Sequence, residues 1–304
     1  MNTPDLVLVG NLLVDDLVFE DGTTRMGQPG GSLLHAALAS SAWGARVGCV
    51  SVLGSDYPRA ILALLQARGV SLEGVVQLGA PGVRVWLLYE GGVRRMVGRL
   101  GRPTHDEVSP SSGQVPATWR SARAMHVAPM PFERQRELVE AFGDGARVLS
   151  IDPLVPITED SLEEWRAVLS LADVLFVSQD DLLLPGARER PEALLRALVV
   201  GRLRYVVHKR GSSGGALYDA QEGRLRTWSA CAAKEVDPTG AGDAFAGAFM
   251  AALVAGAHVD DAIARGAATA SFAVEGMGAD ALRVVSSSEL HARRRACVVS
   301  SRPA

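Results

Sequence analysis

The amino-acid sequence predicts a doubly wound α/β fold, in which helices cover both faces of a mostly parallel β-sheet. Apolar, β-branched runs recur along the chain, helical stretches lie between them, and two segments of different character interrupt this alternation. Runs that are almost continuously apolar are typical of parallel strands buried on both faces. The length of 304 residues allows one such domain with its own core, so we expect a single domain over residues 1–304.

The expected strands are the runs at 6–10, 46–54, 124–129, 146–153, 173–178 and 204–209. The clearest helix between strands lies at 58–69, where Pro58 suits the first turn and Gly69 suits the C-terminal cap. Beyond residue 258 the pattern is helical, and the serines that open SSSELHARRR suit the N-terminal cap of a last helix.

Two segments, at about 12–28 and 79–101, resemble short strands joined by glycine-containing turns. The Gly91–Gly92 pair suits a tight hairpin. We expect both segments to form a small β-sheet, a lid over one edge of the domain. Its aromatic residues are expected to form the core of the lid, or alternatively to stack on a bound base; they are Phe19, Trp86 and Tyr89.

Composition excludes several classes of protein. The net charge of −3 gives no global reason to bind nucleic acid, and we expect the basic run Arg293–Arg295 to be a solvated helix face. No segment has the ~20 apolar residues that span a bilayer, and the N-terminus lacks the features of a signal peptide, so we expect a cytoplasmic protein. Cys49, Cys231 and Cys297 have no metal-ligand spacing and are expected to be buried thiols.

The stretch VDPTGAGDAFAGAFM at 236–250 places a carboxylate, Asp243, where an apolar helix begins. Unpaired N–H groups at a helix start attract an anion, and the glycines Gly240 and Gly242 beside Ala241 allow it to approach closely. Asp243 either complements the helix dipole or takes a proton from a substrate hydroxyl during phosphoryl transfer. The residue pattern alone leaves both interpretations open.

DPTGAGDAFAGAFM closely resembles the C-terminal motif of the ribokinase-like (PfkB) carbohydrate kinases. In that family the aspartate after Gly-Ala-Gly is the catalytic base, and the preceding amides form the anion hole. The resemblance continues through GNLLVDD at 10–16, the glycine pair and helix at 30–56, KRGSSGGALYD at 209–219 and ATASFAVEGMGA at 268–279. It implies a ribokinase-like fold, with Asp243 as general base and the amides of residues 240–243 as anion hole.

On the acceptor side, the resemblance implies that Asp15 holds substrate hydroxyls and that Gly30 and Gly31 let the backbone approach the substrate. Strand-end solvation of Asp15 and a plain glycine turn are the alternatives. Ser32 and His35 stand where relatives close to ribokinase have lysine and asparagine, which argues against ribose. We expect His35 to contact substrate, or otherwise to be a satisfied core histidine.

On the nucleotide side, the resemblance implies that Gly211 and Gly214 shape a loop against ATP, with a plain turn as alternative. Lys209 would reach a phosphate or lie beside the nucleotide, unless it is an exposed strand-end lysine. Ala267 and Ser271 would border adenine, although Ala267 replaces an asparagine of some relatives.

The resemblance also implies a place for metal ions. The family motif Asn-x-x-Glu is Ser178-Gln179-Asp180-Asp181 here, so Asp181 would bind Mg²⁺ through water, with Ser178 alternatively a simple helix cap. Asp237 lies near the family's monovalent-cation loop, such as a K⁺ site, or simply forms an Asp-Pro turn.

These residues predict an ATP-dependent kinase that phosphorylates a hydroxyl of a small sugar or polyol. A nucleoside kinase of the same fold, or a non-catalytic sensor that binds nucleotide or sugar, are the alternatives. Neither a dinucleotide-binding G-x-G-x-x-G after the first strand nor a Walker P-loop is present. The resemblance further implies a homodimer formed through the lid, because an edge strand needs cover.

Overall fold

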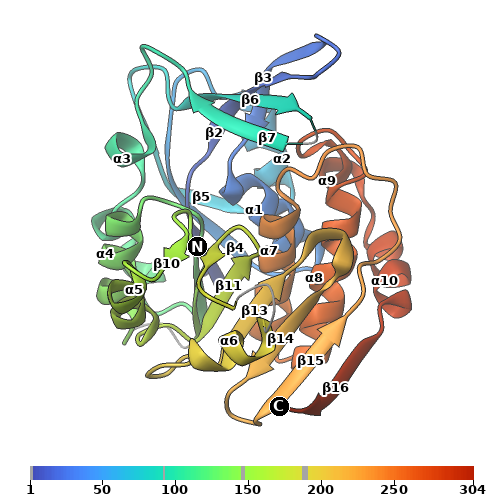
Figure 1. Cartoon of the computed structure of the whole chain (residues 1–304). Coiled ribbons are helices and arrows are strands. Elements are labelled where there is room, and N and C mark those ends of the chain that lie inside the picture. The colour runs from blue at the N-terminus through green and yellow to red at the C-terminus, as the bar shows by residue number, and fades with distance from the viewer. Residues whose placement is uncertain (1–2, 92, 145–147, 187–190) are drawn as a thin grey trace.

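The computed structural model describes residues 3–91, 93–144, 148–186 and 191–304. Within this part of the chain, the main sheet has ten strands (Figure 1). In spatial order they are β16 (Val299–Pro303), β15 (Arg224–Trp228), β14 (Gly215–Asp219), β13 (Tyr205–Lys209), β11 (Val174–Ser178), β9 (Val148–Ile151), β8 (Ala124–Val127), β1 (Leu6–Val9), β4 (Val47–Leu53) and β5 (Ser71–Gln77). Strands β13 to β5 pair in parallel, which confirms a mostly parallel sheet.

All six predicted apolar runs are strands of this sheet, namely β1, β4, β8, β9, β11 and β13. Residues 146 and 147 of the predicted strand at 146–153 lie outside the described residues. The antiparallel edge formed by β14, β15 and β16 was not predicted. Its strands mix glycine, arginine and serine with apolar residues, so they lack the continuous hydrophobic run that marks a strand buried on both faces.

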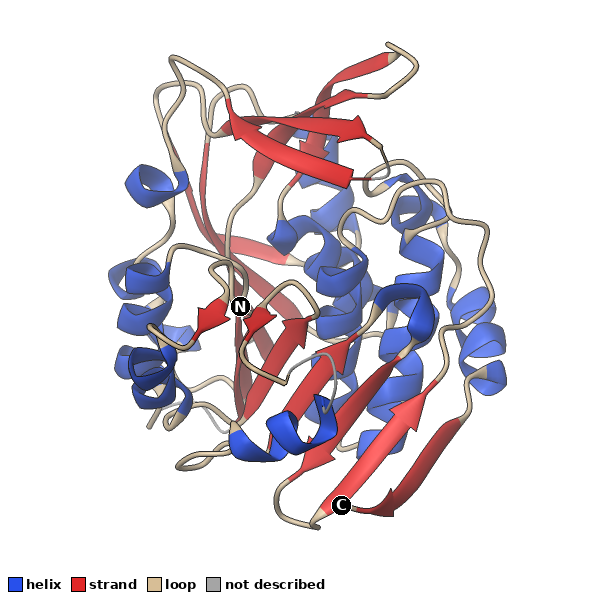
Figure 2. Cartoon of the chain, in the orientation of Figure 1, coloured by secondary structure: helices blue, strands red, loops and turns tan. Residues whose placement is uncertain are grey.

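Helices cover both faces of the sheet (Figure 2). Successive side chains of β1 show this, because Leu6 and Leu8 pack in one hydrophobic cluster while Val7 and Val9 pack in the other. The first cluster includes residues of α1 (Ser32–Ala42), α2 (Arg59–Ala67), α7 (Ala241–Val254), α8 (Val259–Ala273) and α9 (Asp280–Val284). The second includes residues of α4 (Phe132–Phe142), α5 (Leu162–Leu169) and α6 (Pro191–Ala197). The structure therefore has the doubly wound arrangement that the sequence predicts.

Shorter elements complete the described chain. They are α3 (His105–Val108), the 3₁₀ turns η1 (Ser112–Gln114), η2 (Ala117–Trp119) and η3 (Gly211–Ser213), and the strand pair β10 (Ile157–Thr158) and β12 (Leu182–Leu183). Helix α2 matches the predicted helix at 58–69, with Pro58 as its N-cap and Gly69 at φ 77° after its end.

A small second sheet lies over one end of the domain, at the top of Figure 1. Its strands, in spatial order, are β3 (Thr24–Gly30), β2 (Leu13–Val18), β6 (Arg84–Glu90) and β7 (Val93–Gly98). The two predicted insertions therefore form one separate sheet. Gly91, at φ 58°, starts the turn between β6 and β7, and Gly92 lies outside the described residues.

The aromatic residues of the small sheet contact neighbours within the protein. The Phe19 and Tyr89 rings stack with their centroids 5.1 Å apart, and the Arg99 guanidinium lies 4.9 Å from the centre of the Trp86 ring. The Tyr89 hydroxyl donates to Asp237 at 2.9 Å. These contacts favour the interpretation of the three aromatic residues as structural parts of the small sheet.

The cysteine prediction is wrong for two of the three residues. Cys231, in the loop after β15, and Cys297, at the end of α10 (Ser287–Ala296), form a disulfide bond. Their separation of 66 residues carries no signal in the sequence, because only the tertiary structure brings them together. Cys49 is a free, buried thiol as predicted, and burial raises its pKa to about 12.

Helix α10 begins as predicted, because the Ser286 side chain accepts a hydrogen bond from the backbone N–H of Glu289. The basic run in this helix is less solvated than predicted. The Arg293 guanidinium lies 3.5 Å from the centre of the Phe272 ring, and Arg294 pairs with Asp261. Two of the three arginines thus fix α10 to α8. In the described chain, no helix combines the length and apolarity required to cross a membrane.

Candidate active site

The predicted site residues come from the small sheet, from the carboxyl ends of parallel strands and from the start of α7. Asp15 lies in β2 of the small sheet, Asp181 follows β11, and Lys209 is the last residue of β13. The carboxyl edge of a doubly wound sheet is where such folds bind ligands, because the loops there diverge. The fold therefore gathers residues from distant segments, because 228 positions separate Asp15 from Asp243.

Helix α7 starts after a glycine in the left-handed region, Gly240 at φ 75°. The N–H of Ala241 donates to the carbonyl of Pro238 at 3.3 Å. The backbone N–H groups of Gly240 and Gly242 have no hydrogen-bond partner among the residues that the structure describes. Asp243 lies in the first turn and is half-buried. The start of α7 thus offers two free amide donors beside a carboxylate, which suits an anion.

On the acceptor side, Asp15 lies against the glycine pair. Its side chain is buried, and a Cβ atom on Gly30 would overlap the Asp15 carboxylate. Gly31 has φ 97°, and a Cβ there would overlap the Asn11 carbonyl oxygen. Both glycines are therefore required for this close approach within the protein, and their role toward an acceptor stays a prediction. Ser32 is half-buried and begins α1 directly after the pair.

His35 connects the acceptor side with the start of α7. Its Nδ1 lies 3.2 Å from the Gly31 carbonyl oxygen, and a Cβ on Gly240 would overlap the imidazole ring. The ring is 2% exposed, and its Nε2 has no hydrogen-bond partner among the described residues. His35 is thus buried but not a satisfied core histidine, because one ring nitrogen is left unpaired.

Two buried polar groups near Asp15 were missed by the sequence reasoning. The Tyr57 hydroxyl and the Asn11 Oδ1 atom are buried without a hydrogen-bond partner in the described chain. The Asn11 amide donates to Ser109 at 2.9 Å. Burial and the nearby Asp15 carboxylate raise the pKa of Tyr57, so the phenol stays protonated and can donate a hydrogen bond. Buried polar atoms without partners are rare unless a ligand or water satisfies them.

Lys209 is not an exposed strand-end lysine. Its side chain is 14% exposed, and its Nζ lies 2.5 Å from Oδ2 of Asp152, which directly follows β9. Burial raises the pKa of Asp152 to about 7; the Lys209 ammonium opposes this shift, while the carboxylates of Asp181 and Asp243 increase it. Burial opposes the charge of Lys209 too, but the same three carboxylates hold its pKa above the ordinary value. Asp152 was missed because Asp-Pro after a strand resembles a turn.

The predicted metal residue Asp181 folds back on its own loop. Its Oδ2 accepts a hydrogen bond from the N–H of Ser178 at 2.5 Å, and the Ser178 hydroxyl accepts one from the N–H of Asp180. No group of three His, Cys, Asp or Glu side chains that could hold a metal ion occurs in the described part of the chain. The arrangement fits Mg²⁺ only through water and nucleotide oxygens, as expected for an ion that retains several waters.

Asp237 holds the segment before α7 in place. Its Oδ1 accepts hydrogen bonds from the N–H of Thr239 and the hydroxyl of Tyr89, each at 2.9 Å, and its Oδ2 accepts one from the N–H of Gly278 at 2.8 Å. The side chain is fully buried. Burial raises its pKa, but these hydrogen bonds outweigh burial and hold the pKa below its usual value. Both carboxylate oxygens thus hold the segment before α7, Oδ2 keeps one lone pair, and the monovalent-cation role of Asp237 stays a prediction.

The four nucleotide-side residues lie on η3 and α8. Gly211 begins η3 at φ 53° and Gly214 follows its end at φ 78°, and a Cβ on Gly214 would overlap the backbone of Trp228. Ala267 packs in the core of α8, and the Ser271 hydroxyl donates to the Ala268 carbonyl and accepts from Arg293. Packing within the protein therefore accounts for Gly214, Ala267 and Ser271, and their nucleotide role stays a prediction.

A cavity of about 600 Å³ lies between the small sheet and the loops after β8 and β9. Val85, which pairs with Asp15 in the small sheet, lines it beside Met96, Phe132 and Leu154. Arginine side chains line the same cavity, namely Arg84, Arg99 and Arg102. Arg84 and Arg99 both pair with the fully buried Asp16, at 2.6 and 2.5 Å. Val85 connects this cavity with Asp15 through the register of β2 and β6, while Asp15 and the glycine pair are not among the residues that line it.

The fold and the candidate site define an α/β protein in which one buried imidazole lies between the start of α7 and the glycine pair beside Asp15. Residues 7–284 match the family described as pfkB family carbohydrate kinase. The chain belongs to the PfkB carbohydrate kinase family.

Similar proteins include kinases with different acceptors. The chain is 29% identical over 270 residues to a cytidine kinase of Thermococcus kodakarensis, covering 86% of this chain and 93% of that protein. It is 26% identical to probable fructokinase-5 of Arabidopsis thaliana, with 83% of each chain covered. A ribokinase II structure from E. coli, in complex with ATP and Mg²⁺, superposes with a TM-score of 0.74 at 21% identity, covering 96% of this chain and 99% of that one. The ribokinase-like fold is confirmed, and sugar and nucleoside acceptors both occur among the relatives.

Proposed function

We propose that this protein transfers the γ-phosphate of ATP to a hydroxyl group of a small sugar, a polyol or a nucleoside, with Asp243 as general base. The observation that carries the proposal is the position of His35. Its ring contacts both the glycine pair beside Asp15 and Gly240 at the start of α7. An acceptor beside Asp15 would therefore lie next to the anion-binding amides, as in-line transfer requires.

Each residue has one task in this reaction. Asp15 and the Gly30–Gly31 backbone hold the acceptor, and Asp243 takes the proton of the attacking hydroxyl. The acceptor oxygen then bonds to the γ-phosphorus as the bond to the β,γ-bridging oxygen breaks, and ADP leaves. The amides of Gly240 and Gly242 stabilise the charge of the transferring group. Mg²⁺, when bound with the nucleotide near Asp181, offsets phosphate charge.

The nucleotide would lie along the loop formed by Lys209 to Gly214 and the 267–279 region, as the family resemblance implies. A monovalent cation near Asp237 is a proposal from the family resemblance; Oδ2 of Asp237 accepts one hydrogen bond and keeps a second lone pair. A homodimer through the small sheet and a cytoplasmic location remain expectations from the sequence.

A nucleoside is the acceptor that the cavity favours over a simple polyol. The cavity of about 600 Å³ extends from Val85 beside Asp15 to Phe132 and has both apolar walls and arginines. A base needs an apolar slot together with a few polar groups, whereas a triose or hexose would leave most of this space empty. The similarity to a cytidine kinase supports the same choice.

A panel of sugars, cyclitols and nucleosides in a coupled ADP-release assay tests the proposal. Turnover with nucleosides and little with sugars would support the larger acceptor, and the reverse would support a small polyol. Thermal stabilisation by ligands without ADP formation from any acceptor would contradict the kinase and support a non-catalytic sensor.

A further inference from the structure

Lys209 is an unusual residue in this chain. The sequence has 31 basic residues, and only two of them, Lys209 and Lys234, are lysines. Every described ion pair other than that of Lys209 uses arginine or histidine as its cation. An ammonium is a compact charge with three donors on a flexible stem, whereas a guanidinium is a wide planar fork. The lysine at this one buried position therefore indicates a role that requires a compact cation rather than a planar guanidinium.

The ammonium of Lys209 points at the start of α7. A Cβ atom built on Gly242 would lie 3.2 Å from Lys209 Nζ, which is tighter than ordinary van der Waals contact. The Phe176 ring lies 5.8 Å from Nζ on another side. Nζ therefore shares the space in front of Gly242, whose own N–H has no partner in the described chain. An anion bound at this amide would contact the ammonium as well.

The neighbouring strand does not supply a donor of comparable reach. Ser178 pairs with Lys209 in the register of β11 and β13 and stands where the family motif has an asparagine. Its N–H donates to Asp181, and its hydroxyl accepts from the N–H of Asp180. Ser178 is thus engaged in its own turn, and Lys209 supplies the polar group next to it.

We propose that Lys209 is a catalytic residue that binds an oxygen of the transferring phosphoryl group, and that Asp152 is the positioning residue that holds its ammonium in front of Gly242. This inference rests on the proposed kinase function and names two residues of the same site. A long side chain has many rotamers, and the hydrogen bond to Asp152 restricts them before substrate binds. A fixed cation in a water-poor site stabilises developing phosphoryl charge without reorganisation.

Lys209→Met and Asp152→Asn test the proposal in the coupled ADP-release assay. We expect Lys209→Met to lower kcat about 10²- to 10³-fold, as when one charge-stabilising donor is removed, with little change in the KM of the acceptor. Asp152→Asn should lower kcat roughly tenfold, because the ammonium is kept but loosely held. A wild-type kcat in Lys209→Met would overturn the proposal.

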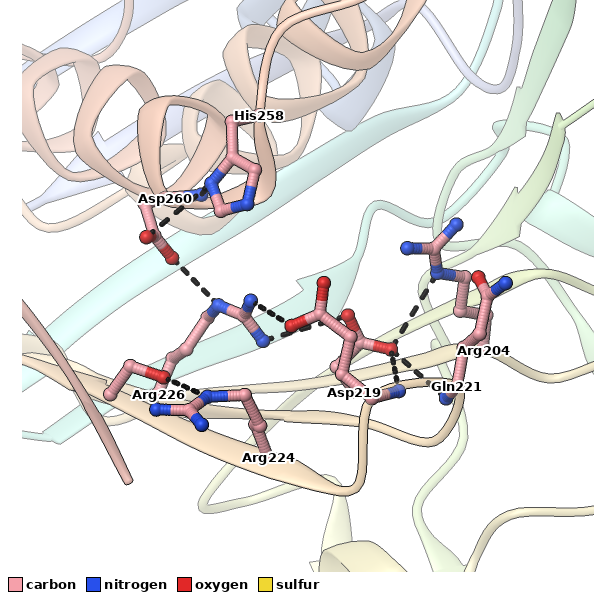
Figure 3. Close-up of polar contacts among 9 residues, drawn as sticks. Arg204, Asp219, Gln221, Arg224, Arg226, His258 and Asp260 are labelled. Carbon is pink, nitrogen blue, oxygen red and sulfur yellow. Dashed lines mark hydrogen bonds and ion pairs between the residues drawn. The ribbon is translucent and has the colours of Figure 1, made fainter. Parts of the chain in front are cut away.

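The matched control is Arg204→Met. Arg204 precedes β13 at its other end and pairs with the buried Asp219 at 3.6 Å (Figure 3), so this variant also removes a cation from a buried carboxylate. Its kcat should equal that of the wild type. If Lys209→Met does not fold, the double variant Lys209→Met/Asp152→Asn removes both charges, and the same loss of kcat is expected from it.

A binding measurement separates this proposal from the proposed function. Calorimetry compares ADP with the non-hydrolysable analogue AMP-PNP, both with Mg²⁺. Lys209→Met should lower the affinity for AMP-PNP at least tenfold and leave that for ADP within about twofold, because only AMP-PNP carries a γ-phosphate. Equal losses for both nucleotides, or none, would overturn the role of Lys209. Absence of ADP release from any acceptor by the wild type would refute the kinase instead, and the binding comparison would still decide on Lys209.

Discussion

The sheet carries a buried cluster of charges at each end of strand β13, and the two clusters differ in how well their charges are matched. At the amino end, Arg226 of β15 lies 3.5 Å from Asp219 and donates to Glu222 and Asp260 (Figure 3). Its side chain is 2% exposed. Asp219 also accepts from two backbone N–H groups. Each of these described charged groups thus has an opposite charge within 4 Å, although Asp219 Oδ2 and one Arg226 terminal nitrogen make no hydrogen bond.

At the carboxyl end, one ammonium faces three carboxylates, those of Asp152, Asp181 and Asp243. Asp152 is hydrogen-bonded to it, and the amides of Gly240 and Gly242, which have no partner in the described chain, lie at the start of α7 beside the same space. Excess negative charge next to the amides that we propose as an anion hole suits a ligand that brings both anionic oxygens and a divalent cation. The comparison indicates that the amino end serves stability and that the carboxyl end is arranged for a ligand.

The largest expected effect is the loss of turnover in Asp243→Asn. Removal of a general base should lower kcat by about 10²–10⁴, or roughly 3–5 kcal/mol in the barrier, without a change in melting temperature. The matched control is Asp260→Asn, which alters an aspartate in the first turn of α8 that binds Arg226. It should lower the melting temperature and keep kcat. Full activity of Asp243→Asn would contradict the assignment of catalysis to the carboxyl end of β13.

Arg226→Met should show the opposite pattern. Removal of the cation leaves the buried Asp219 with Arg204 and two backbone N–H donors but without its nearest charge partner, which is expected to cost about 1–3 kcal/mol in the free energy of unfolding. Urea denaturation would measure this loss, and kcat per folded molecule should be unchanged. Arg224→Met is the control, because Arg224 is bound to Ser301 at the sheet edge and its removal should cost about 1 kcal/mol or less. Equal costs for both arginines would contradict the role of Arg226.

Removal of the disulfide bond tests whether a loss of stability can occur without a loss of turnover at the carboxyl end of β13. Cys231 and Cys297 close a loop of 66 residues that contains Asp243 and Asp260. Chain entropy predicts that its removal costs about 4 kcal/mol. The double variant Cys231→Ser/Cys297→Ser should therefore melt at a lower temperature but keep its kcat at 20 °C. Selective loss of kcat, with unchanged melting, would instead connect the disulfide to the carboxyl end.

The sequence predicted those parts of the architecture whose conformation is determined by neighbouring residues in the chain. Continuous apolar runs identified the parallel strands, and the glycines before Asp243 identified the start of α7. The Gly91–Gly92 pair indicated the hairpin of the small sheet, of which the structure describes Gly91. In each case, the conformation follows from neighbours in sequence.

The features that were missed depend on contacts between distant segments. In the sequence, Asp152 resembles a turn residue. Its partner Lys209 lies 57 positions away, so only the fold shows that the two side chains are in contact. Cys231 and Cys297 carried no spacing signal, and the Tyr57 hydroxyl had no visible link to Asp15. Long-range pairing of polar side chains cannot be inferred from periodicity, because it is set by which strand ends the fold brings together.

The smallest expected effect is a change in pH dependence. The pKa of Asp152 is about 7 in the folded protein, above its value of about 4 in the unfolded chain, so between these values the folded state binds more protons. Its contribution to stability is therefore complete below about pH 4 and is lost as the pH rises through 7. Melting curves from pH 5 to 8 should fall less steeply for Asp152→Asn than for the wild type.

Lys209 does not disturb this comparison, because its raised pKa keeps it charged over the whole range. Arg226→Met is the control, because it leaves Asp152 unchanged and should keep the wild-type slope at a lower melting temperature. Parallel curves for the wild type and Asp152→Asn would mean that Asp152 is fully ionised at neutral pH. The ammonium of Lys209 would then neutralise it as completely as Arg226 neutralises its partners, and the two ends of β13 would not differ in charge matching.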